Sequence, residues 1–402
     1  MHGICHPRPR ATPRAGTSLP AVRLAVFTDY VYRRRDGRLY AERAFALFLA
    51  RLGTLIDRLV LVGRYAPSSE AAPYALPEDV EFVGLPYYER LGPASALGAF
   101  TRALRRFWRA LDDVDCIWLL GPHPFAVPFA AIAALRRRRV VLGVRQEFMA
   151  YIGNRHPGRP LWKLAAFVLE GSFRLLGRFC SVVVVGPDLA RQYRHSRDLL
   201  EINVSLVAES EIVDPAADGR EYEGELRLLS VGRLETEKNP LLLAEVLALL
   251  AADGRDWRLR VCGEGHLAPE LEGRLTKLGV ADRAELLGYV PFGQALDEIY
   301  RSSHVLLHVS WTEGLPQVLL EGFAAATPVV ATDVGGVGAA VGDAALLIAP
   351  GDAPGAADAV RRVVAEPALR ARLRSAGHRY ALAHTAEVET RRVAEFLRHD
   401  AG

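Results

Sequence analysis

The chain has 402 residues, of which 50% are hydrophobic and 24% are charged, and its formal net charge is +3. This length exceeds that of a typical single core and therefore predicts two domains. The longest uninterrupted apolar run, 125–135, is too short to span a membrane, and residues 1–20 lack the apolar segment of a secretory signal. We expect residues 1–20 to form a disordered leader.

The net charge conceals an asymmetry between the two halves. Residues 1–205 hold 30 Lys and Arg against 17 Asp and Glu, a balance of +13, whereas residues 206–402 hold 20 against 30, a balance of −10. A basic first half predicts an anionic partner, either a phospholipid surface or a polyanionic saccharide. No nucleic-acid partner is expected, because no base-stacking or groove-reading motif is evident. The alternative is that the arginines reflect genome composition.

The four cysteines are Cys5, Cys116, Cys180 and Cys262, and they are not paired at the spacing of metal ligands. The last three lie in apolar runs typical of strands. We interpret them as buried thiols in a reducing cytoplasm, and expect neither a disulfide framework nor a metal site.

Short β-rich runs alternate with longer amphipathic runs, a pattern typical of α/β units with parallel strands. In the first half the expected strands are 23–28, 58–63, 80–85, 116–120, 140–144 and 181–185, and the expected helices are 40–52, 94–111, 124–135 and 160–177. In the second half the expected strands are 226–231, 259–262, 284–287, 305–309, 329–332 and 345–348. The helices expected there are 240–251, 268–278, 296–301, one that carries Glu321, 356–365 and long helices over 367–398.

Residues 208–224 are polar, contain Pro and Gly and show no periodicity, so they predict a linker. It separates a first α/β domain, 21–207, from a second, 225–380. Residues 381–402 are expected to form a C-terminal helix that packs back on the first domain. Two such domains facing each other form a cleft, where ligands tend to bind.

The stretch 310–336, SWTEGLPQVLLEGFAAATPVVATDVGG, is the most informative of the chain. Glu313 lies in a Gly-Pro turn before an expected helix, and Glu321 lies on that helix. Helix N-terminal amides between two carboxylates suit a ligand with hydroxyls on both sides of a phosphate, such as a sugar nucleotide. The alternative for each carboxylate alone is a complement to the helix dipole or a solvated side chain.

A pair of cations follows the expected strand 226–231. Gly232 allows a tight exit from the strand, and Arg233 and Lys238 follow it. Two cations at one loop can clamp a diphosphate and stabilise charge on a leaving phosphate. The alternative is a solvated basic pair that forms surface ion pairs with neighbouring glutamates.

Two more segments follow strand ends and could contact the same ligand. Gly263 and Gly265, in the sequence VCGEG, can let backbone approach a phosphate or a sugar. A turn at 287–291, LGYVP, could present backbone groups to the edge of a base.

The order GRL-x-x-EKNP, CGEG, LGYV, WTEGLPQVLLEG, TPVVATDVGG and IAPGD resembles the donor domain of retaining GT-B glycosyltransferases, the large fourth sequence family of group 1 type. The resemblance is dense over 225–365 and loose elsewhere. It implies two Rossmann-like domains that face each other across a cleft, the first on the acceptor side and the second binding a nucleotide sugar. It also implies sugar transfer with retention, without a metal, and with the nucleotide sugar as a substrate rather than a cofactor.

Carried over by position, the resemblance assigns roles to four charged residues. Arg233 and Lys238 would hold the pyrophosphate, and Glu313 would contact hydroxyls of the donor sugar, so these three are expected to be catalytic. Glu321 would bind the ribose hydroxyls. No carboxylate is assigned as a nucleophile.

The resemblance also assigns uncharged donor contacts. The amides of Gly314 and Leu315 would meet the phosphate or the sugar at the helix N-terminus, and Gly263 would allow close approach of the backbone. Tyr289 and Val290 would lie beside the base.

The first half departs from the family pattern. Only Gly37 is expected to approach the diphosphate, because the usual Gly-rich loop is absent. Where the family places a His, this chain has Arg145, which could hold an anionic acceptor or a donor oxygen, or pair with Glu147. His123 could substitute for the missing His on the acceptor side, or be an ordinary loop residue.

Residues 99–111, AFTRALRRFWRAL, predict a basic amphipathic helix that could lie on an anionic membrane surface. The stretch 160–180 and the arginines at 136–139 favour the same interpretation. The alternative is a domain helix with a solvated arginine face.

The sequence thus predicts a glycosyltransferase of hexosyltransferase type that uses a UDP or GDP donor in polysaccharide or glycolipid biosynthesis. Its acceptor would be a saccharide, a lipid-linked or a small molecule, and its location the cytoplasm, with attachment to the cytoplasmic face of a membrane left open. The alternative is a non-catalytic GT-B protein that binds a nucleotide sugar or glycan as a partner subunit. A nucleotide-dependent oxidoreductase is not expected, because no G-x-G-x-x-G follows the first strand.

Overall fold

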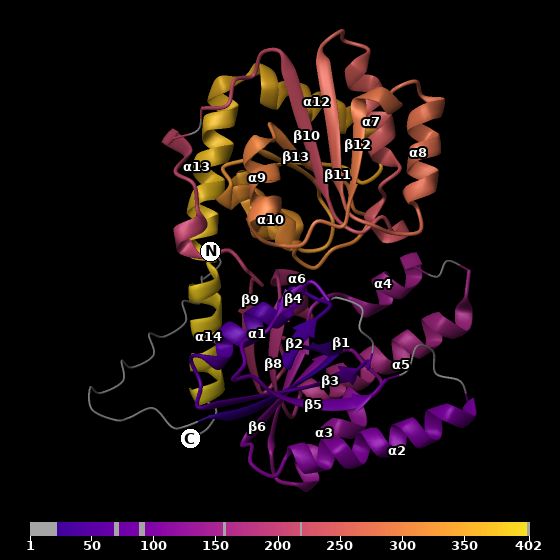
Figure 1. Ribbon diagram of the computed structural model, residues 1–402, viewed down its shortest axis with the longest axis vertical. Coiled ribbons are helices and arrows are strands. Elements are labelled where there is room, and N and C mark those ends of the chain that lie inside the picture. Colours follow the sequence, from indigo (N-terminus) through magenta and orange to yellow (C-terminus); the bar gives the residue numbers. More distant parts are fainter. Residues whose placement is uncertain (1–21, 68–71, 88–92, 156–157, 218, 400–402) are drawn as a thin grey trace, which may run out of the picture.

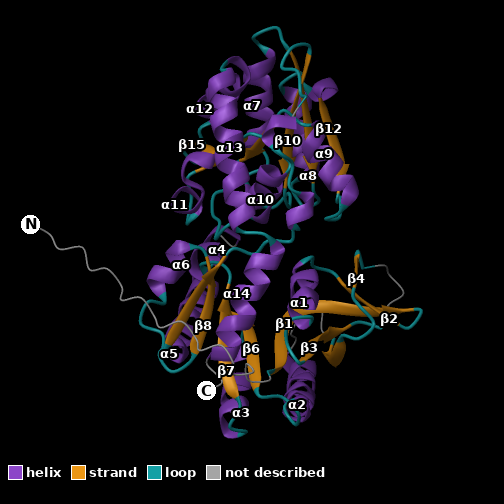
Figure 2. Cartoon of the chain, turned by 90° about the vertical axis from the view of Figure 1, so that its left-hand side faces the viewer, coloured by secondary structure: helices purple, strands orange, loops and turns teal. Residues whose placement is uncertain are grey.

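The computed structural model describes residues 22–67, 72–87, 93–155, 158–217 and 219–399. It contains two α/β domains stacked along the long axis of the molecule, each built on a mostly parallel sheet covered by helices (Figures 1 and 2). The predicted two-domain α/β architecture is thereby confirmed.

The sheet of the first domain holds nine strands. They are β1 (Arg23–Arg35), β2 (Arg38–Ala41), β3 (Arg58–Tyr65), β4 (Tyr74–Ala75), β5 (Glu81–Pro86), β6 (Cys116–Gly121), β7 (Arg139–Val144), β8 (Ser181–Val185) and β9 (Asp198–Ile202). The main body is parallel in the order β5-β3-β1-β6-β7-β8-β9, and β2 and β4 form an antiparallel flap on the far end of β1. The strand order reverses between β1 and β6, which opens a crevice at their carboxyl ends.

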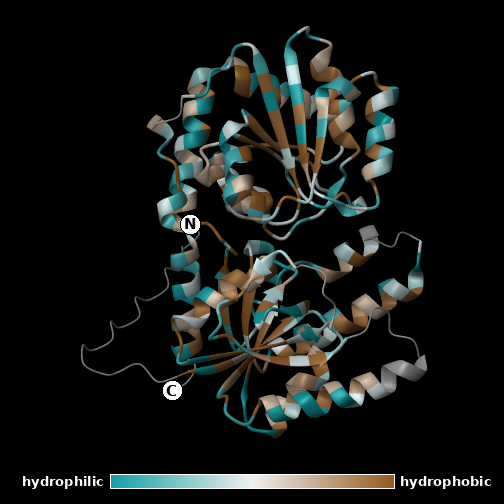
Figure 3. Ribbon diagram, in the orientation of Figure 1, coloured by the Kyte–Doolittle hydropathy of each residue, from teal (hydrophilic) through white to brown (hydrophobic). Residues whose placement is uncertain are grey.

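Helices cover both faces of this sheet, so β6, β7 and β8 are largely apolar and β8 is buried along its whole length (Figure 3). The helices are α1 (Phe45–Gly53), α2 (Pro93–Ala110), α3 (Ala126–Leu135), α4 (Phe148–Arg155), α5 (Pro160–Gly177) and α6 (Pro187–Gln192). Phe107, Phe129 and Phe173 join α2, α3 and α5 in one core cluster on one face. Helix α1 packs on the other face, in a second cluster.

The second domain repeats the same architecture with six strands. They are β10 (Glu225–Val231), β11 (Asp256–Cys262), β12 (Ala284–Gly288), β13 (Val305–His308), β14 (Val329–Thr332) and β15 (Ala345–Ile348), all parallel in the order β12-β11-β10-β13-β14-β15. Its helices are α7 (Leu242–Ala251), α8 (Ala268–Lys277), α9 (Gln294–Ser302), α10 (Gln317–Ala324), α11 (Val337–Val341), α12 (Ala353–Ala365) and α13 (Pro367–Ala383). The order reverses between β10 and β13, so the loops after these two strands flank the second crevice.

The last helix, α14 (Ala386–His399), returns to the first domain (Figure 1). Glu387 accepts a hydrogen bond of 2.8 Å from Arg51 of α1, and Arg398 donates to the backbone oxygen of Leu55. Val393 and Leu397 of α14 are buried in the same cluster as α1. The carboxyl-terminal helix therefore ties the two domains together on one side.

The structure corrects the start of the expected helix 40–52. Arg38–Ala41 form β2 instead, and the helix begins at Phe45. Asp36 and Gly37 both have positive φ angles, 51° and 79°, and make the tight turn between β1 and β2. An Asp-Gly pair between alternating residues is a strong hairpin signal, and here it overrides the helical pattern that follows.

Candidate active site

The two domains present the carboxyl ends of their strands to each other across a cleft of about 650 Å³. Both points of strand-order reversal open onto it. The second domain lines it with loops that include Arg233, Lys238, Tyr289, Glu313, Gly314 and Leu315, and the first domain with loops that include Tyr30, His123 and Arg145. The structure thus brings together most of the predicted site residues.

The loops of the second domain are packed directly on one another. An added Cβ on Gly263 would lie 1.8 Å from the backbone oxygen of Gly232, and one on Gly335 would lie 2.0 Å from that of Glu313. Glycine is therefore required at both positions for loop-to-loop contact. Gly263 lies outside the described lining of the cleft, so it fixes the shape of the loop after β10 from behind.

Glu313 is the centre of a buried polar cluster at the cleft floor. Its Oε1 pairs with Lys238 Nζ, accepts a hydrogen bond of 2.7 Å from Ser310 Oγ, and lies 3.0 Å from His308 Nε2. Burial alone would raise the pKa of Glu313, but the Lys238 ammonium and His308 outweigh it and hold this pKa well below its ordinary value. The carboxylate is therefore ionised at neutral pH and fixed in one orientation, with Lys238 beside it at the cleft surface.

Arg233 is oriented by a second buried carboxylate. Its Nη2 lies 2.9 Å from Oε1 of Glu237, whose side chain is 2% exposed. Among the described residues, Arg233 is the partner that compensates the buried negative charge of Glu237. The peptide nitrogen of Trp311 donates to the backbone oxygen of Glu237 at 2.9 Å, so the loops after β10 and β13 hold each other in place. Each cation is paired with a buried carboxylate while its own side chain stays partly exposed, 37% for Arg233 and 23% for Lys238, so neither forms a pair between two solvated side chains.

The amino-terminal end of α10 points at the same place. Glu313, Gly314 and Leu315 lead into the helix, and Gln317 is its first residue. The first amides of a helix have no acceptor within it and carry partial positive charge. Gln317 also lines the cleft, and its buried Nε2 finds no hydrogen-bond partner among the described residues. This end of the cleft offers several donors to an anionic, oxygen-rich ligand.

The opposing wall carries the two acceptor-side candidates. Arg145 contacts the hydroxyl of Tyr30, and its guanidinium carbon lies 4.3 Å from the centre of the Phe45 ring. His123 Nδ1 accepts a hydrogen bond of 3.2 Å from the peptide nitrogen of Phe125, and its Nε2 lies 3.3 Å from Oδ1 of Asp29. Both side chains line the cleft and are held from behind, with Arg145 placed on an aromatic ring.

Tyr289 is the predicted base-side residue that bridges the domains. Its hydroxyl lies 2.6 Å from the hydroxyl of Tyr74 in the β2–β4 flap, and Tyr74 also accepts a hydrogen bond of 3.1 Å from the peptide nitrogen of Phe292. Val290 is half-buried against the core and does not belong to the described lining. The flap therefore rests on the loop after β12.

Two other predicted donor residues lie away from the main cleft. Gly37 is at the tip of the β1–β2 hairpin, where its positive φ serves the turn. Glu321 lines a separate cavity of about 190 Å³ between α9 and α10, and accepts a hydrogen bond of 2.8 Å from the hydroxyl of Tyr300. Burial raises the pKa of Glu321 to about 7.

The raised pKa of Glu321 predicts a specific pH dependence of stability. The folded state binds this proton more tightly than the unfolded state, so the stabilisation is complete below the unfolded pKa of about 4.3 and is lost as pH rises through about 7. Between roughly pH 5 and pH 8, the wild-type free energy of unfolding should fall by on the order of 2 kcal/mol relative to Glu321→Gln. Urea unfolding of both proteins at the two pH values measures this difference, and parallel pH profiles would contradict it.

Several residues of the site were not singled out from the sequence. His308 and Ser310 hold Glu313, Glu237 holds Arg233, and Tyr74 reaches across from the other domain. A signal for the first two was available, since polar residues directly after a buried parallel strand lie at the ligand edge of the sheet. Tyr74 belongs to a two-residue strand with no pattern of its own, and only the tertiary structure identifies it.

Comparison with known families points to the second domain. Residues 216–380 match the family described as "Glycosyl transferases group 1". The alpha-D-kanosaminyltransferase of Streptomyces kanamyceticus is 31% identical over 148 residues, which are 36% of this chain and 38% of that protein. The curated relatives are matched over only part of their length, 15%, 38% and 36% for three of them.

Solved structures resemble the chain over nearly its whole length. Sucrose-phosphate synthase from Thermosynechococcus elongatus superimposes with a TM-score of 0.74 at 16% identity, covering 94% of this chain and 98% of that one. Anabaena HepE in complex with UDP-glucose superimposes with a TM-score of 0.68 at 16% identity, covering 94% and 99%. At such identities the likeness establishes the two-domain fold.

Proposed function

We propose that this chain, whose residues 216–380 match the glycosyl transferases group 1 family, transfers a sugar from a nucleotide-sugar donor to a saccharide, lipid-linked or small-molecule acceptor. The observation that carries the proposal is the convergence of Lys238, Arg233 and the amino-terminal end of α10 at one point of the interdomain cleft. Relatives named as glycosyltransferases, and a structural neighbour that binds UDP-glucose, support it.

The donor diphosphate would lie where these positive groups meet. Arg233 and Lys238 would contact its oxygens, and the amides of Gly314 and Leu315 would face the phosphate attached to the sugar. Glu313, kept ionised and oriented by Lys238, His308 and Ser310, would accept hydrogen bonds from hydroxyls of the donor sugar. Its low pKa suits that role, because a carboxylate accepts with both oxygens.

The nucleoside would extend toward the loop after β12. Tyr289 and Val290 would lie beside the base, with Gly263 shaping the neighbouring loop. The ribose would reach toward Glu321, whose carboxylate lies on α10 four residues beyond the cleft-lining Gln317. Gly37 would approach this region only by movement of the flap that carries it.

The chemistry follows from the charge arrangement. The bond between the anomeric carbon and the terminal phosphate oxygen breaks, and the acceptor hydroxyl oxygen forms the new bond to that carbon. The hydroxyl proton passes to water, and the nucleoside diphosphate leaves with one added negative charge. Fixed cations and helix amides that face this charge stabilise the transition state. Because they provide that stabilisation themselves, we propose a reaction without a metal, and with retention as the family resemblance implies.

The acceptor would bind against the first domain. His123, held by Asp29, faces the cleft beside the point where the sugar would lie. Arg145 is held on Phe45 and contacts Tyr30, so its charge is available to an anionic group on the acceptor or to a donor oxygen.

Turnover by the purified chain tests the proposal. We expect release of nucleoside diphosphate from one of a panel of UDP-, GDP-, ADP- and TDP-linked sugars, with slow hydrolysis in the absence of an acceptor. Lys238→Ala should keep at most about a hundredth of the activity, whereas Lys277→Ala, which alters an exposed lysine of the same domain, should match the wild type. Tight binding of a nucleotide sugar without any turnover would instead support a non-catalytic partner subunit.

A further inference from the structure

Helix α5 carries large apolar side chains that face solvent. Leu161, Leu164, Phe167, Val168 and Leu175 are each between 56% and 77% exposed. Scattered exposed apolar residues are common, but five on one helix form a continuous surface of a kind that marks an interaction site. Phe179, just after the helix, is 72% exposed and extends it.

The exposed residues form a second stripe, opposite the one that faces the core. Ala166, Glu170, Phe173 and Gly177 are buried and recur at helical spacing, so they define the inner face. Positions 161, 164, 168 and 175 also recur at helical spacing, but half a turn away. Since a surface helix needs only one apolar stripe to fold, the outer stripe serves another purpose. Leu161, Leu164, Phe167, Val168 and Leu175 are called the outer stripe below.

The exposed charges on the segment that carries the outer stripe have one sign. Throughout 158–180, which the structure describes in full, the acidic residue is Glu170, and it is buried and bonded to Arg174 and to the peptide nitrogen of Met149. Arg159, Lys163 and Arg178 are exposed in the same stretch. An apolar helix face whose own segment exposes only cations complements an anionic lipid surface better than it complements a second copy of itself.

The outer stripe lies on the basic side of the first domain. Helices α2 and α5 contribute to the same core cluster and cover the same face of the sheet (Figure 1). On α2, Arg102, Arg105 and Arg109 are exposed, and no acidic residue occurs along its length. Among the described helices, none combines the length and apolarity needed to cross a bilayer. The surface therefore suits a helix that lies in the membrane interface.

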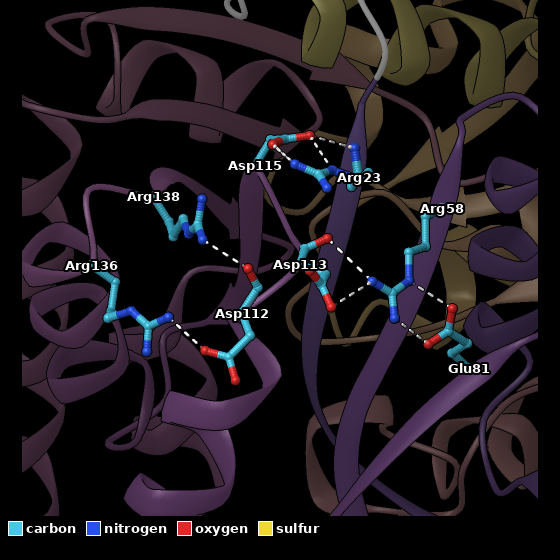
Figure 4. Close-up of polar contacts among 8 residues, drawn as sticks. All are labelled: Arg23, Arg58, Glu81, Asp112, Asp113, Asp115, Arg136 and Arg138. Atoms are coloured by element: carbon cyan, nitrogen blue, oxygen red, sulfur yellow. Dashed lines mark hydrogen bonds and ion pairs between the residues drawn. The ribbon is translucent and has the colours of Figure 1, made fainter.

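In the arginine run between α3 and β7, Arg137 is exposed, whereas Arg136 and Arg138 are held by Asp112. Arg136 donates a hydrogen bond of 2.6 Å to the carboxylate of Asp112, and Arg138 donates to its backbone oxygen at 2.9 Å (Figure 4). Arg58 is likewise held by Glu81 and Asp113 (Figure 4). These contacts tie Arg58, Arg136 and Arg138 to neighbouring segments, whereas the arginines of α2 and α5 named above are exposed.

We infer that the outer stripe of α5 inserts into the interfacial region of an anionic phospholipid membrane. The inference adds a membrane partner to the proposed function, and it rests on that function because the membrane would bring an acceptor to the cleft. Helix α4 packs against α5 and lines the catalytic cleft with Phe148 and Tyr151. A membrane at α5 would therefore lie next to the mouth of the cleft, where a lipid-linked acceptor could enter from the bilayer.

Vesicle co-sedimentation of the full chain tests the inference. The wild type should bind vesicles of phosphatidylcholine mixed with phosphatidylglycerol, bind phosphatidylcholine alone weakly, and bind less as salt increases. Leu164→Gln/Phe167→Gln/Val168→Gln should weaken binding by about a hundredfold or more. The matched control, Leu249→Gln/Leu278→Gln/Leu382→Gln, changes three exposed leucines of the second domain and should bind like the wild type.

A charge pair provides an independent variant. Lys163→Glu/Arg178→Glu should weaken binding to anionic vesicles by at least about thirtyfold, whereas Lys277→Glu/Arg372→Glu on the second domain should not. Binding by the wild type that is equal on both vesicle types, or absent from both, would overturn the inference. So would a stable dimer in sedimentation velocity that the outer-stripe variant converts to monomer without any effect on vesicles.

These outcomes are separable from those of the proposed function. Vesicle binding is measured without any nucleotide sugar, and nucleotide binding is measured without vesicles. A chain that binds a nucleoside diphosphate but no vesicle retains the proposed function and loses the membrane surface. A chain that binds anionic vesicles but no nucleotide keeps the membrane surface and loses the proposed function.

Discussion

Lys238→Ala is expected to lower kcat by about a hundred- to a thousandfold, the usual consequence of removing one charged or hydrogen-bonding group that faces a leaving oxyanion. Lys238 lies at the cleft surface, and its Nζ pairs with Glu313. The loss should fall on kcat more than on KM, because the charge that Lys238 compensates increases most in the transition state. Steady-state kinetics of donor turnover measure it.

The same substitution should also destabilise the protein, by about 2 kcal/mol. Glu313 is buried, and without Lys238 its hydrogen-bond partners among the described residues are Ser310 and His308. The stabilisation due to its low pKa is present above the ordinary glutamate value and is lost on acidification, so the deficit should be largest near neutral pH. Lys277→Ala should alter neither property. If a folded Lys238→Ala protein had wild-type kinetics, the assignment of Lys238 to the active site would be wrong.

Arg233→Ala is expected to have the second largest effect, and on two properties at once. It removes a cation from the cleft and leaves the carboxylate of Glu237 buried without compensation. The first change should lower kcat/KM by about a hundredfold. The second should lower the free energy of unfolding by about 3 kcal/mol, because an unpaired buried charge is strongly destabilising. Denaturant unfolding and donor turnover measure the two effects separately.

A double variant separates these effects. Arg233→Ala/Glu237→Gln removes both charges, so most of the lost stability should return. Turnover should remain low, because the cation in the cleft is still missing. Recovery of both properties together would mean that Arg233 acts only as a structural partner of Glu237, and the diphosphate clamp would then be wrong.

The fold could be predicted from the sequence because its signals are local. Runs such as β8 and β14 are short, apolar and β-branched, and they are bounded by Gly, Pro or polar residues. The long extension of β1 and the β2–β4 flap were missed, since β2 has four residues and β4 has two, and both gain their stability from pairing with β1. Strand β9 was missed for a similar reason, because it is an edge strand with mixed polarity.

The candidate site could be predicted in part, for a different reason. Arg233, Lys238 and Glu313 follow strand ends, and parallel topology alone brings those ends together. Which carboxylate would hold which cation was not predictable, because Glu237 and Glu235 are both close in sequence to the arginine. The fold buries Glu237 and leaves Glu235 to pair with His266. The placement of Glu321 beside Tyr300 likewise depends on the packing of α9 on α10.

The sequence predicted the charge asymmetry and pointed to 99–111, 160–180 and 136–139, but it did not show which of their arginines are held by carboxylates. The expected amphipathic helix at 99–111 forms most of α2, where Phe107 is buried and the arginines face solvent. The structure adds the outer stripe of α5, and it shows that Arg136 and Arg138 are occupied by Asp112 (Figure 4). Net charge alone does not distinguish arginines held by carboxylates from exposed ones, so the folded chain was needed to choose among these segments.

The central claim is that the cleft binds a nucleoside diphosphate through Arg233 and Lys238. Thermal-shift measurements with UDP, GDP, ADP and TDP at millimolar concentration test it most directly, with Arg233→Ala/Glu237→Gln alongside the wild type. A ligand at a hundred times its dissociation constant adds about 2.7 kcal/mol of stability, which is readily measured. We predict that one of the four nucleotides clearly raises the melting temperature of the wild type and does not raise that of the double variant. An equal rise in both proteins, or no rise with any nucleotide, would contradict the claim.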